Sequence, residues 1–181
     1  DLYYDIGGGP DLDMAPYYLT ALIYLLGRVK RVTGSHKKTF STRKILSKPR
    51  KGEIIQVEAP THISSILDFH TGVICTMMMS FDIWGSTLPR IELYGTEGTL
   101  SLPDPNTFGG PLKILKSGKD TWENIPIPKN AGQRGMGLED MADSIKNNKH
   151  PLTDCQNAAH VVNIIESVRI SSEKNQHIYL K

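Results

Sequence analysis

The sequence predicts an α+β fold, built as an open, mainly antiparallel β-sheet with helices packed on one face. Three observations lead to this class. Short segments with period-two alternation of apolar residues occupy the middle of the chain. The turns between them are too short for the crossovers that parallel strands need. The last third of the chain has apolar residues at helical spacing, and strands followed by helices are typical of an α+β domain.

The first helix is expected from Pro16 to Leu26, because a proline at its start and Gly27 just after its end are typical helix boundaries. Three glycines, Gly7–Gly9, precede this helix, and Asp13 lies between the glycines and the helix. Asp13 is thus expected at the helix N-terminus, where free N–H groups and the macrodipole favour a carboxylate. Two interpretations stay open: a glycine turn with a capping aspartate and a core helix, or a reactive carboxylate beside a glycine loop.

The segments expected as strands are short and rich in alternating apolar residues: Val29–Phe40, Glu53–Glu58, Thr61–Phe69, Val73–Phe81, Arg90–Tyr94, Thr99–Leu102, Leu112–Leu115, Thr121–Ile125 and His177–Leu180. The basic stretch from His36 to Lys51 is interpreted as a solvated strand edge and loop, since aromatic interleaving is nearly absent. Segments such as Ile74–Met79 carry apolar residues at both alternations, which predicts an exposed apolar sheet face that serves as an interface.

Two further helices are expected near the C-terminus. Met136–Asn147 has apolar residues at helical spacing, and Thr153–Gln156 fits a capping box that opens the last helix. Five residues form one apolar stripe on that helix: Ala158, Val161, Val162, Ile165 and Val168.

Composition narrows the function classes. With 181 residues the chain is long enough for one domain, 1–181, with its own core, and a net charge of +2 is too small to indicate nucleic-acid binding. No run reaches the ~18 apolar residues of a membrane span. The histidines and the two cysteines, Cys75 and Cys155, show no metal-ligand spacing, so no metal is expected. The isolated cysteines are interpreted as reduced core thiols of a cytoplasmic protein.

The glycine segment resembles the start of the C-terminal domain of the Gfo/Idh/MocA oxidoreductases. Gly7–Gly9 and Asp13 match the family pattern, whereas Ala15 replaces a glycine and Tyr17 replaces a histidine. The resemblance is greatest to a subgroup with Gly-Gly-Gly-Pro and Asp-Met-Gly-Pro-Tyr-Tyr. Further segments resemble the family in the same order along the chain: Arg90–Leu100, Asp104–Pro111, Arg134–Ala142, Asn157–His160 and Ile165–Ser167.

This resemblance implies the substrate-binding and oligomerisation domain of a two-domain, NAD- or NADP-dependent dehydrogenase. Such enzymes act by hydride transfer on a sugar, a polyol or a related hydroxyl compound. In the family a separate N-terminal Rossmann domain holds the cofactor and carries a lysine in a Glu-Lys-Pro motif. This chain has neither, and no Gly-x-Gly-x-x-Gly follows a strand, so no cofactor is expected on it and alone it should be inactive. The family associates through the open sheet face, which implies self-association here.

The resemblance also implies the site residues. Asp13 would lie next to the substrate hydroxyl and orient it or accept its proton. Tyr17 stands where the family has its histidine, but a phenol is a poor base at neutral pH, so Tyr17 could instead hydrogen-bond the substrate.

Four more residues are candidates for substrate binding. Gly8 and Gly9 allow close backbone approach, His160 lies near the start of the last helix, and Trp84 offers a stacking surface for a sugar. A structural histidine and a core or interface tryptophan are the alternatives. Because Tyr17 departs from the family pattern, a non-catalytic ligand-binding or scaffold protein on the same fold stays open. A nucleic-acid module is disfavoured by charge and aromatic content.

Overall fold

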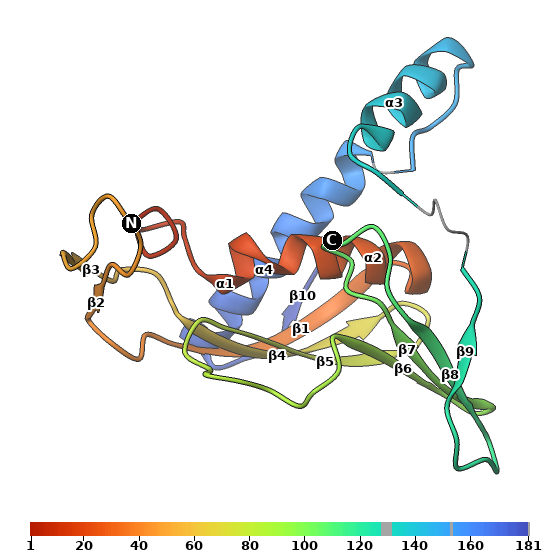
Figure 1. Cartoon of the computed structure of the whole chain (residues 1–181), viewed down its shortest axis with the longest axis horizontal. Helices are drawn as coiled ribbons and strands as arrows, with labels where there is room; N and C mark the ends of the chain where they lie inside the picture. The colour runs from red at the N-terminus through yellow and green to blue at the C-terminus, as the bar shows by residue number, and fades with distance from the viewer. Residues whose placement is uncertain (128–131, 153, 181) are drawn as a thin grey trace. The chain divides into compact units, whose positions relative to one another are not determined.

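The computed structural model describes residues 1–127, 132–152 and 154–180. They form two compact units (Figure 1). The first unit combines Asp1–Trp84 with the C-terminal segment that begins at Cys155, and the second unit is Gly85–Asp154. The first unit is therefore discontinuous in the sequence.

The first unit is a four-stranded antiparallel sheet with helices on one face, as the fold class predicts. Its helices are α1 (Pro10–Asp13), α2 (Ala15–Leu26) and α4 (Cys155–Lys174). Its strands are β1 (Val29–Lys37), β2 (Thr42–Lys44), β3 (Ile54–Gln56), β4 (His62–Phe69), β5 (Ile74–Ser80) and β10 (Ile178–Tyr179). The sheet has the order β10-β1-β4-β5, and β2 pairs only with β3. Figure 1 shows α2 and α4 on the same side of the sheet.

The core of this unit lies between the sheet and the two long helices. The residues that are almost fully buried there come from α2, β1, β4 and α4: Leu19, Val29, Val32, Ile63, Leu67, Phe69, Ile164, Ile165 and Val168. In β4 these side chains alternate with exposed ones, as expected of a strand with one face on a core. Burial of apolar area between two layers is therefore the main source of stability in this unit.

Helix α4 lies directly on β1. A Cβ added to Gly34 would meet the Val168 Cγ1 atom at 2.5 Å and the Val168 carbonyl oxygen at 2.8 Å, so only glycine permits this approach. The Gly34 N–H donates to the Ser171 hydroxyl and the His36 N–H donates to the Ser172 hydroxyl, both at 3.0 Å. Because the short β10 pairs only with the start of β1, these two serines satisfy amides that lack a strand partner.

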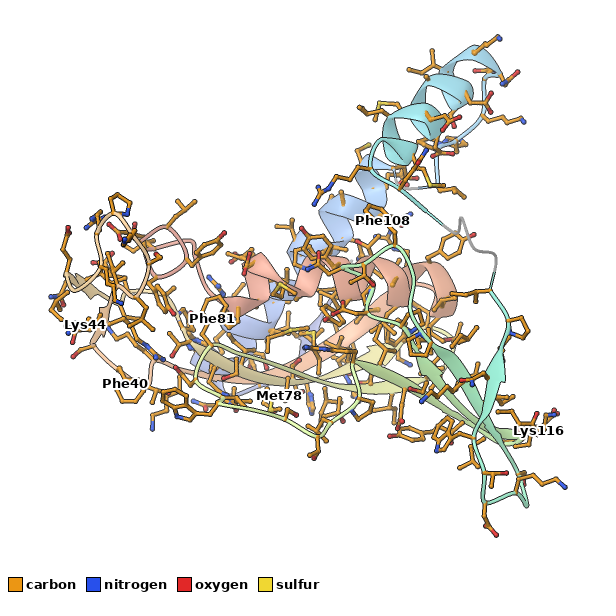
Figure 2. The ribbon with its side chains drawn as sticks, viewed as in Figure 1. Phe40, Lys44, Met78, Phe81, Phe108 and Lys116 are labelled. Carbon is orange, nitrogen blue, oxygen red and sulfur yellow. The ribbon has the colours of Figure 1, made fainter. Side chains whose placement is uncertain are left out.

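The opposite face of the sheet is uncovered within the unit. Ile66, Ile74 and Met78 point to that face and are 47%, 69% and 39% exposed. The Met78 side chain is labelled in Figure 2, on the side of the sheet away from α2 and α4. Its neighbour Met77 points to the core and is buried, which is the alternation predicted from the sequence. The same open face carries an ion pair between Arg31 and Asp68.

The N-terminal segment is tied to the far end of the sheet. The Tyr4 carbonyl oxygen accepts hydrogen bonds from the N–H groups of Glu58 and Ala59, at 2.7 and 3.0 Å. The Tyr4 ring lies 5.6 Å from that of Phe81, a residue labelled in Figure 2. The Arg43 guanidinium lies over the Tyr4 ring and pairs with a carboxylate of the segment that follows β5. These contacts fix the start of the chain, from which the glycine segment continues.

The second unit contains a four-stranded antiparallel meander and one helix. Its elements are β6 (Ile91–Gly95), β7 (Gly98–Leu102), β8 (Leu112–Lys116), β9 (Glu123–Ile125) and α3 (Met136–Lys146). The strand order β6-β7-β8-β9 follows the chain, and each neighbouring pair is antiparallel. The short turns predicted from the sequence thus connect neighbouring strands.

Three features differ from the sequence expectations, and a fourth expectation is not tested. Thr42–Lys44 forms a strand inside the basic stretch, because the turn that follows lets it pair with Ile54–Gln56. The sequence predicts one open sheet, but the strands of the two units belong to separate sheets, β10-β1-β4-β5 and β6-β7-β8-β9. The segment between β5 and β6 forms no strand. Cys155 is exposed and Cys75 is half-buried, so Cys155 is not a core thiol; it begins α4 on the solvent side. The proposed capping box depends on Thr153, which lies outside the described residues.

Candidate functional site

The glycine segment is held by a buried ion pair that sequence reasoning missed. Arg169, in the second half of α4, donates from Nε to Asp11 Oδ2 and from Nη2 to Asp11 Oδ1, each at 2.7 Å. Its Nη2 atom also donates to the Gly8 carbonyl oxygen at 2.7 Å. The Asp11 side chain is 2% exposed and that of Arg169 is 15% exposed. This two-pronged geometry gives charge-assisted hydrogen bonds in a fixed orientation, and the bond to Asp11 raises the pKa of Arg169.

Gly8 and Gly9 are required by close packing. A Cβ on Gly8 would meet the Tyr3 carbonyl oxygen at 2.6 Å. A Cβ on Gly9 would meet Asp11 Oδ1 at 2.7 Å and Arg169 Nη2 at 3.0 Å, and Gly9 also has a φ of +114°. Both N–H groups donate within the segment, from Gly8 to the Asp5 carbonyl and from Gly9 to the Tyr3 carbonyl. The structure therefore uses the backbone of these glycines for internal bonds, and substrate binding by them stays a prediction.

Asp13 is the last residue of α1, and it does not cap α2. Met14 is the N-cap of α2, and this helix has no side-chain cap bond. The reason is that Pro10, a favourable first helical residue, starts a helical turn before Asp13 is reached. The Asp13 N–H accordingly donates to the Gly9 carbonyl at 3.0 Å. Asp13 is half-buried, and its carboxylate makes no hydrogen bond or ion pair within residues 1–127, 132–152 and 154–180.

Tyr17 lies in the first turn of α2, one helical turn beyond Asp13. Its side chain is 48% exposed, whereas the neighbouring Tyr18 is buried at 6%. The Tyr17 N–H donates to the Met14 carbonyl at 3.2 Å, which continues the helical path from α1 into α2. Its hydroxyl, like the Asp13 carboxylate, has no hydrogen-bond partner in the described part of the chain. Asp13 and Tyr17 thus lie four residues apart in the sequence at the N-terminal end of α2.

His160 lies at the other end of α2. Its Nε2 atom accepts a hydrogen bond from the Val29 N–H at 3.0 Å, so Nε2 is unprotonated and Nδ1 carries the proton of the neutral ring. Val29 follows the C-terminal end of this 12-residue helix, which is about 18 Å long. Asp13 is at its opposite end. His160 is therefore separated from Asp13 and Tyr17, and it fills the structural role that was the alternative.

An open pocket lies against His160. It has a volume of about 440 Å³ and is lined by Arg28, Gln156, Ala159, His160 and Asn163. The His160 Nδ1 atom has no hydrogen-bond partner among the described residues, and because it is buried it exposes almost no surface to this space. Burial lowers the pKa of His160, and the charges of Arg28 and His70 lower it further. Both effects favour the neutral form of the ring.

Trp84 is the last residue of the N-terminal segment of the first unit, and it is fully exposed. Nothing in the described contacts connects it to Asp13 or Tyr17. Its role as a sugar-stacking residue stays a prediction.

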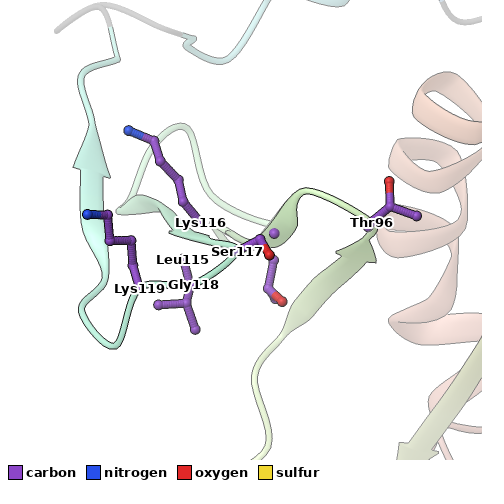
Figure 3. Close-up of a pocket in the computed structure, with 9 residues that line it drawn as sticks. Thr96, Leu115, Lys116, Ser117, Gly118 and Lys119 are labelled. Carbon is purple, nitrogen blue, oxygen red and sulfur yellow. The ribbon is translucent and has the colours of Figure 1, made fainter.

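A second pocket lies in the meander of the second unit (Figure 3). Its volume is about 270 Å³, and the β6–β7 turn and the β8–β9 turn line it with residues such as Thr96, Ser117 and Lys119. Glu97 accepts a hydrogen bond at its carbonyl from the Ser117 N–H, which joins the two turns. None of the predicted site residues lines this pocket, which is shallow and lies on the surface.

Within residues 1–127, 132–152 and 154–180, no group of three or more His, Cys, Asp or Glu side chains is arranged to hold a metal ion. No helix in those ranges has both the length and the apolar character needed to cross a membrane.

Comparison with known proteins identifies the family. Residues 2–101, more than half of the chain, match the model of the GFO/IDH/MocA C-terminal domain. A comparison with curated proteins finds no match.

Solved structures of oxidoreductases share the fold. An NAD-binding oxidoreductase from Klebsiella pneumoniae is 17% identical with a TM-score of 0.78, and levoglucosan dehydrogenase in its apo form is 15% identical with a TM-score of 0.80. In both cases the match covers 100% of this chain and 54% of the other. Aldose-aldose oxidoreductase from Caulobacter crescentus, complexed with glycerol, is 20% identical with a TM-score of 0.70, over 96% of this chain and 48% of that one.

The chain thus spans about half the length of these structures. The match to the domain model and the shared fold agree with the family indicated by the glycine segment. The chain belongs to the GFO/IDH/MocA family and is a C-terminal domain of that family.

Proposed function

We propose that this chain is the substrate-side domain of an NAD- or NADP-dependent oxidoreductase that acts by hydride transfer on a sugar, a polyol or a related hydroxyl compound. Residues 1–181 would act as one functional domain, in the cytoplasm. Family membership supports an oxidoreductase. Among the similar structures, levoglucosan dehydrogenase is a complex with NADH and L-sorbose, and the Caulobacter enzyme is a complex with glycerol.

The observation that carries the proposal is the pair formed by Asp13 and Tyr17. In the part of the chain that the structure describes, neither the carboxylate nor the phenol has a hydrogen-bond partner, and both residues lie at the junction of α1 and α2. Oxidation of an alcohol requires a group that orients the hydroxyl and accepts its proton. In the proposed arrangement, Asp13 accepts the hydrogen bond of the substrate hydroxyl and Tyr17 bonds a neighbouring oxygen, so that the reacting C–H is held in one orientation.

The glycine segment of this chain does not fit a dinucleotide. A pyrophosphate site needs free N–H groups in a glycine-rich turn at the start of a helix. Here the N–H groups of Gly8 and Gly9 are bonded to Asp5 and Tyr3, and the helix that follows has only four residues. The cofactor of the proposed enzyme is therefore assigned to a part of the protein outside this chain, and no cofactor is expected on the chain itself.

Asp13→Asn tests the proposal in the full-length oxidoreductase. Turnover would be measured with NAD and NADP on a panel of aldoses, ketoses and polyols that includes levoglucosan, L-sorbose and glycerol. The substitution removes the charge but nearly conserves shape, and turnover should fall about 10²- to 10⁴-fold. Asp5→Asn, the same change at an exposed residue of the same segment, is the control and should keep its activity.

Tyr17→Phe tests in the same way whether turnover depends on the Tyr17 hydroxyl. Tyr24→Phe is its matched control, since Tyr24 is exposed on the same helix. No turnover on the whole panel by the unmodified protein, or full turnover by Asp13→Asn, would contradict the proposal. The first of these outcomes would favour a ligand-binding or scaffold protein. That alternative is kept because Tyr17 stands where the family has its histidine.

We also propose that the protein self-associates through the open sheet face. Ile66, Ile74 and Met78 form an apolar area there, interrupted by the Arg31–Asp68 ion pair. Contiguous apolar area on a sheet face usually marks an interface. A two-fold contact, in which the same face of both copies takes part, is the commonest solution for identical chains.

A further inference from the structure

A single side chain of the closing helix reaches across to the glycine segment. Arg169 is 158 residues away from Asp11 in the sequence, and it contacts both that carboxylate and the Gly8 carbonyl with three hydrogen bonds of 2.7 Å. Gly8 and Asp11 lie on either side of the start of α1. Arg169 therefore holds the loop and the helix together at the point where the chain turns.

Helix α1 needs such support. It has four residues, and its N-cap, Gly9, provides no side-chain cap bond. Short helices are unstable in isolation, because nucleation fixes several residues for few hydrogen bonds. Asp11, in the first turn, is 1% exposed, and a buried carboxylate without a cation would be costly. Arg169 supplies the countercharge that keeps this turn folded and docked against α4.

The position of Asp13 depends on that turn. The Asp13 N–H donates to the Gly9 carbonyl and the Met14 N–H donates to the Pro10 carbonyl, both at 3.0 Å. Met14 is at once the C-cap of α1 and the N-cap of α2. The backbone position of Asp13 is thus set by α1, whereas that of Tyr17 is set by α2, whose buried side chains pack into the core.

We infer that Arg169 is a positioning residue of the proposed active site: through Asp11 and the Gly8 carbonyl it fixes α1 and thereby the Asp13 carboxylate relative to Tyr17. This inference rests on the proposed function for its catalytic consequence. Its structural part, the hold of Arg169 on α1, is independent of that function.

A double variant distinguishes this positioning role from that of an ion pair that only stabilises the fold. Removing one member of a buried pair destabilises a protein, but replacing both members by apolar residues is often neutral or stabilising. The double variant Asp11→Leu with Arg169→Met should accordingly recover stability. It has no donor for the Gly8 carbonyl and no fork to orient α1, so on this inference it does not recover turnover.

The test compares kcat, KM and amide hydrogen exchange in the full-length oxidoreductase. Arg169→Met should lower kcat on the order of 10- to 100-fold, because a displacement of about 1 Å in a catalytic group has effects of that size. KM should change far less than kcat. The amides of Asp13 and Met14 should exchange faster than in the unmodified protein, while those in the middle of α2 should not. Arg169→Lys keeps the positive charge but cannot make the paired hydrogen bonds of a guanidinium, so its kcat should be intermediate. It replaces Arg169→Met in the comparison if Arg169→Met does not fold.

Val168→Ala is the matched control, one residue away on the same helix. It removes buried methyl groups that face Gly34 and so lowers stability without touching Asp11 or Gly8. It should keep kcat. Unchanged kcat in Arg169→Met, equal losses in Val168→Ala, or full turnover in the stable double variant would each overturn the inference.

The failure of the proposed function gives a different pattern. In that case Asp13→Asn keeps full turnover, or the unmodified protein turns over nothing on the panel. Exchange at Asp13 and Met14 still decides the hold of Arg169 on α1: faster exchange supports it and unchanged exchange overturns it.

Discussion

The Nε2 atom of His160 accepts a hydrogen bond from the backbone N–H of Val29 at 3.0 Å, and this bond joins the first turns of α4 to the start of β1. Protonation of Nε2 would abolish the acceptor and put a charge into a buried position. Burial, together with the charges of Arg28 and His70, accordingly lowers the pKa of His160.

The first prediction concerns pH. The folded-state pKa of His160 lies below the unfolded value of about 6.5, so between these two values the unfolded chain binds more protons. Stability should therefore be lost as the pH falls below about 6.5. Urea unfolding across the range from about pH 5 to 7.5 measures this, and His160→Gln should flatten the slope. His150→Gln, at an exposed histidine, should leave the slope unchanged. An equal slope in His160→Gln would mean that other groups cause it.

The second prediction concerns Gly34. Gly34→Ala places a methyl group 2.5 Å from Val168 Cγ1 and 2.8 Å from a backbone oxygen, so β1 and α4 must separate. The cost should be about 1–3 kcal/mol of unfolding free energy, measured by chemical denaturation. Gly137→Ala is the control, because nothing lies within 4 Å of the added carbon and the residue is inside α3. That change should be neutral or slightly stabilising. An unaltered midpoint for Gly34→Ala would show that the two elements can separate freely.

The third prediction concerns the cofactor. The chain of 181 residues by itself should show no saturable binding of NAD or NADP in calorimetry at millimolar concentration. The reason is that the glycine segment has its N–H groups bonded internally and precedes a helix of only four residues. Saturable binding would contradict the assignment of the cofactor to a part of the protein outside this chain.

The fourth prediction concerns assembly. The chain should be at least a dimer in light scattering at micromolar concentration, because of the apolar area around Ile66 on the open sheet face. Ile66→Lys should shift it towards the monomer, since a charge in a buried contact is costly. Leu46→Lys changes a residue that is 79% exposed on the separate β2–β3 hairpin and should leave the mass unchanged. A monomeric unmodified chain would contradict the proposed interface.

Much of the fold could be predicted because its signals are local. The alternation in β4 and β5, the short turn between them and the proline and glycine around α2 depend only on neighbouring residues. The family could also be indicated, from the glycine segment together with the further segments that resemble the family in the same order along the chain. Helix α1 was missed because it is a single turn that begins at Pro10, and the proposed capping role of Asp13 was wrong for the same reason.

The candidate site was less accessible to sequence reasoning. Asp11 and Arg169 are 158 residues apart, and each looks ordinary in its own segment. The one available signal was Arg169 directly after Val168 of the apolar stripe, where a charge needs a partner. His160 could not be placed relative to Asp13, because its distance from Asp13 depends on how α4 packs against α2. Its binding role, like those of Gly8, Gly9 and Trp84, stays a prediction.

The discontinuity of the first unit has a consequence for biosynthesis. Strands β1, β4 and β5 are translated before residues 85–154, whereas α4, which packs on β1, and β10, which pairs with it, are translated only after them. At about 5–20 residues per second, the core face of the β1-β4-β5 sheet waits for several seconds without one of its two helices. Exposed apolar strands are the species that chaperones bind and that aggregate. A nascent chain stopped before Cys155 should therefore be captured by chaperones, and release should coincide with synthesis of the last helix.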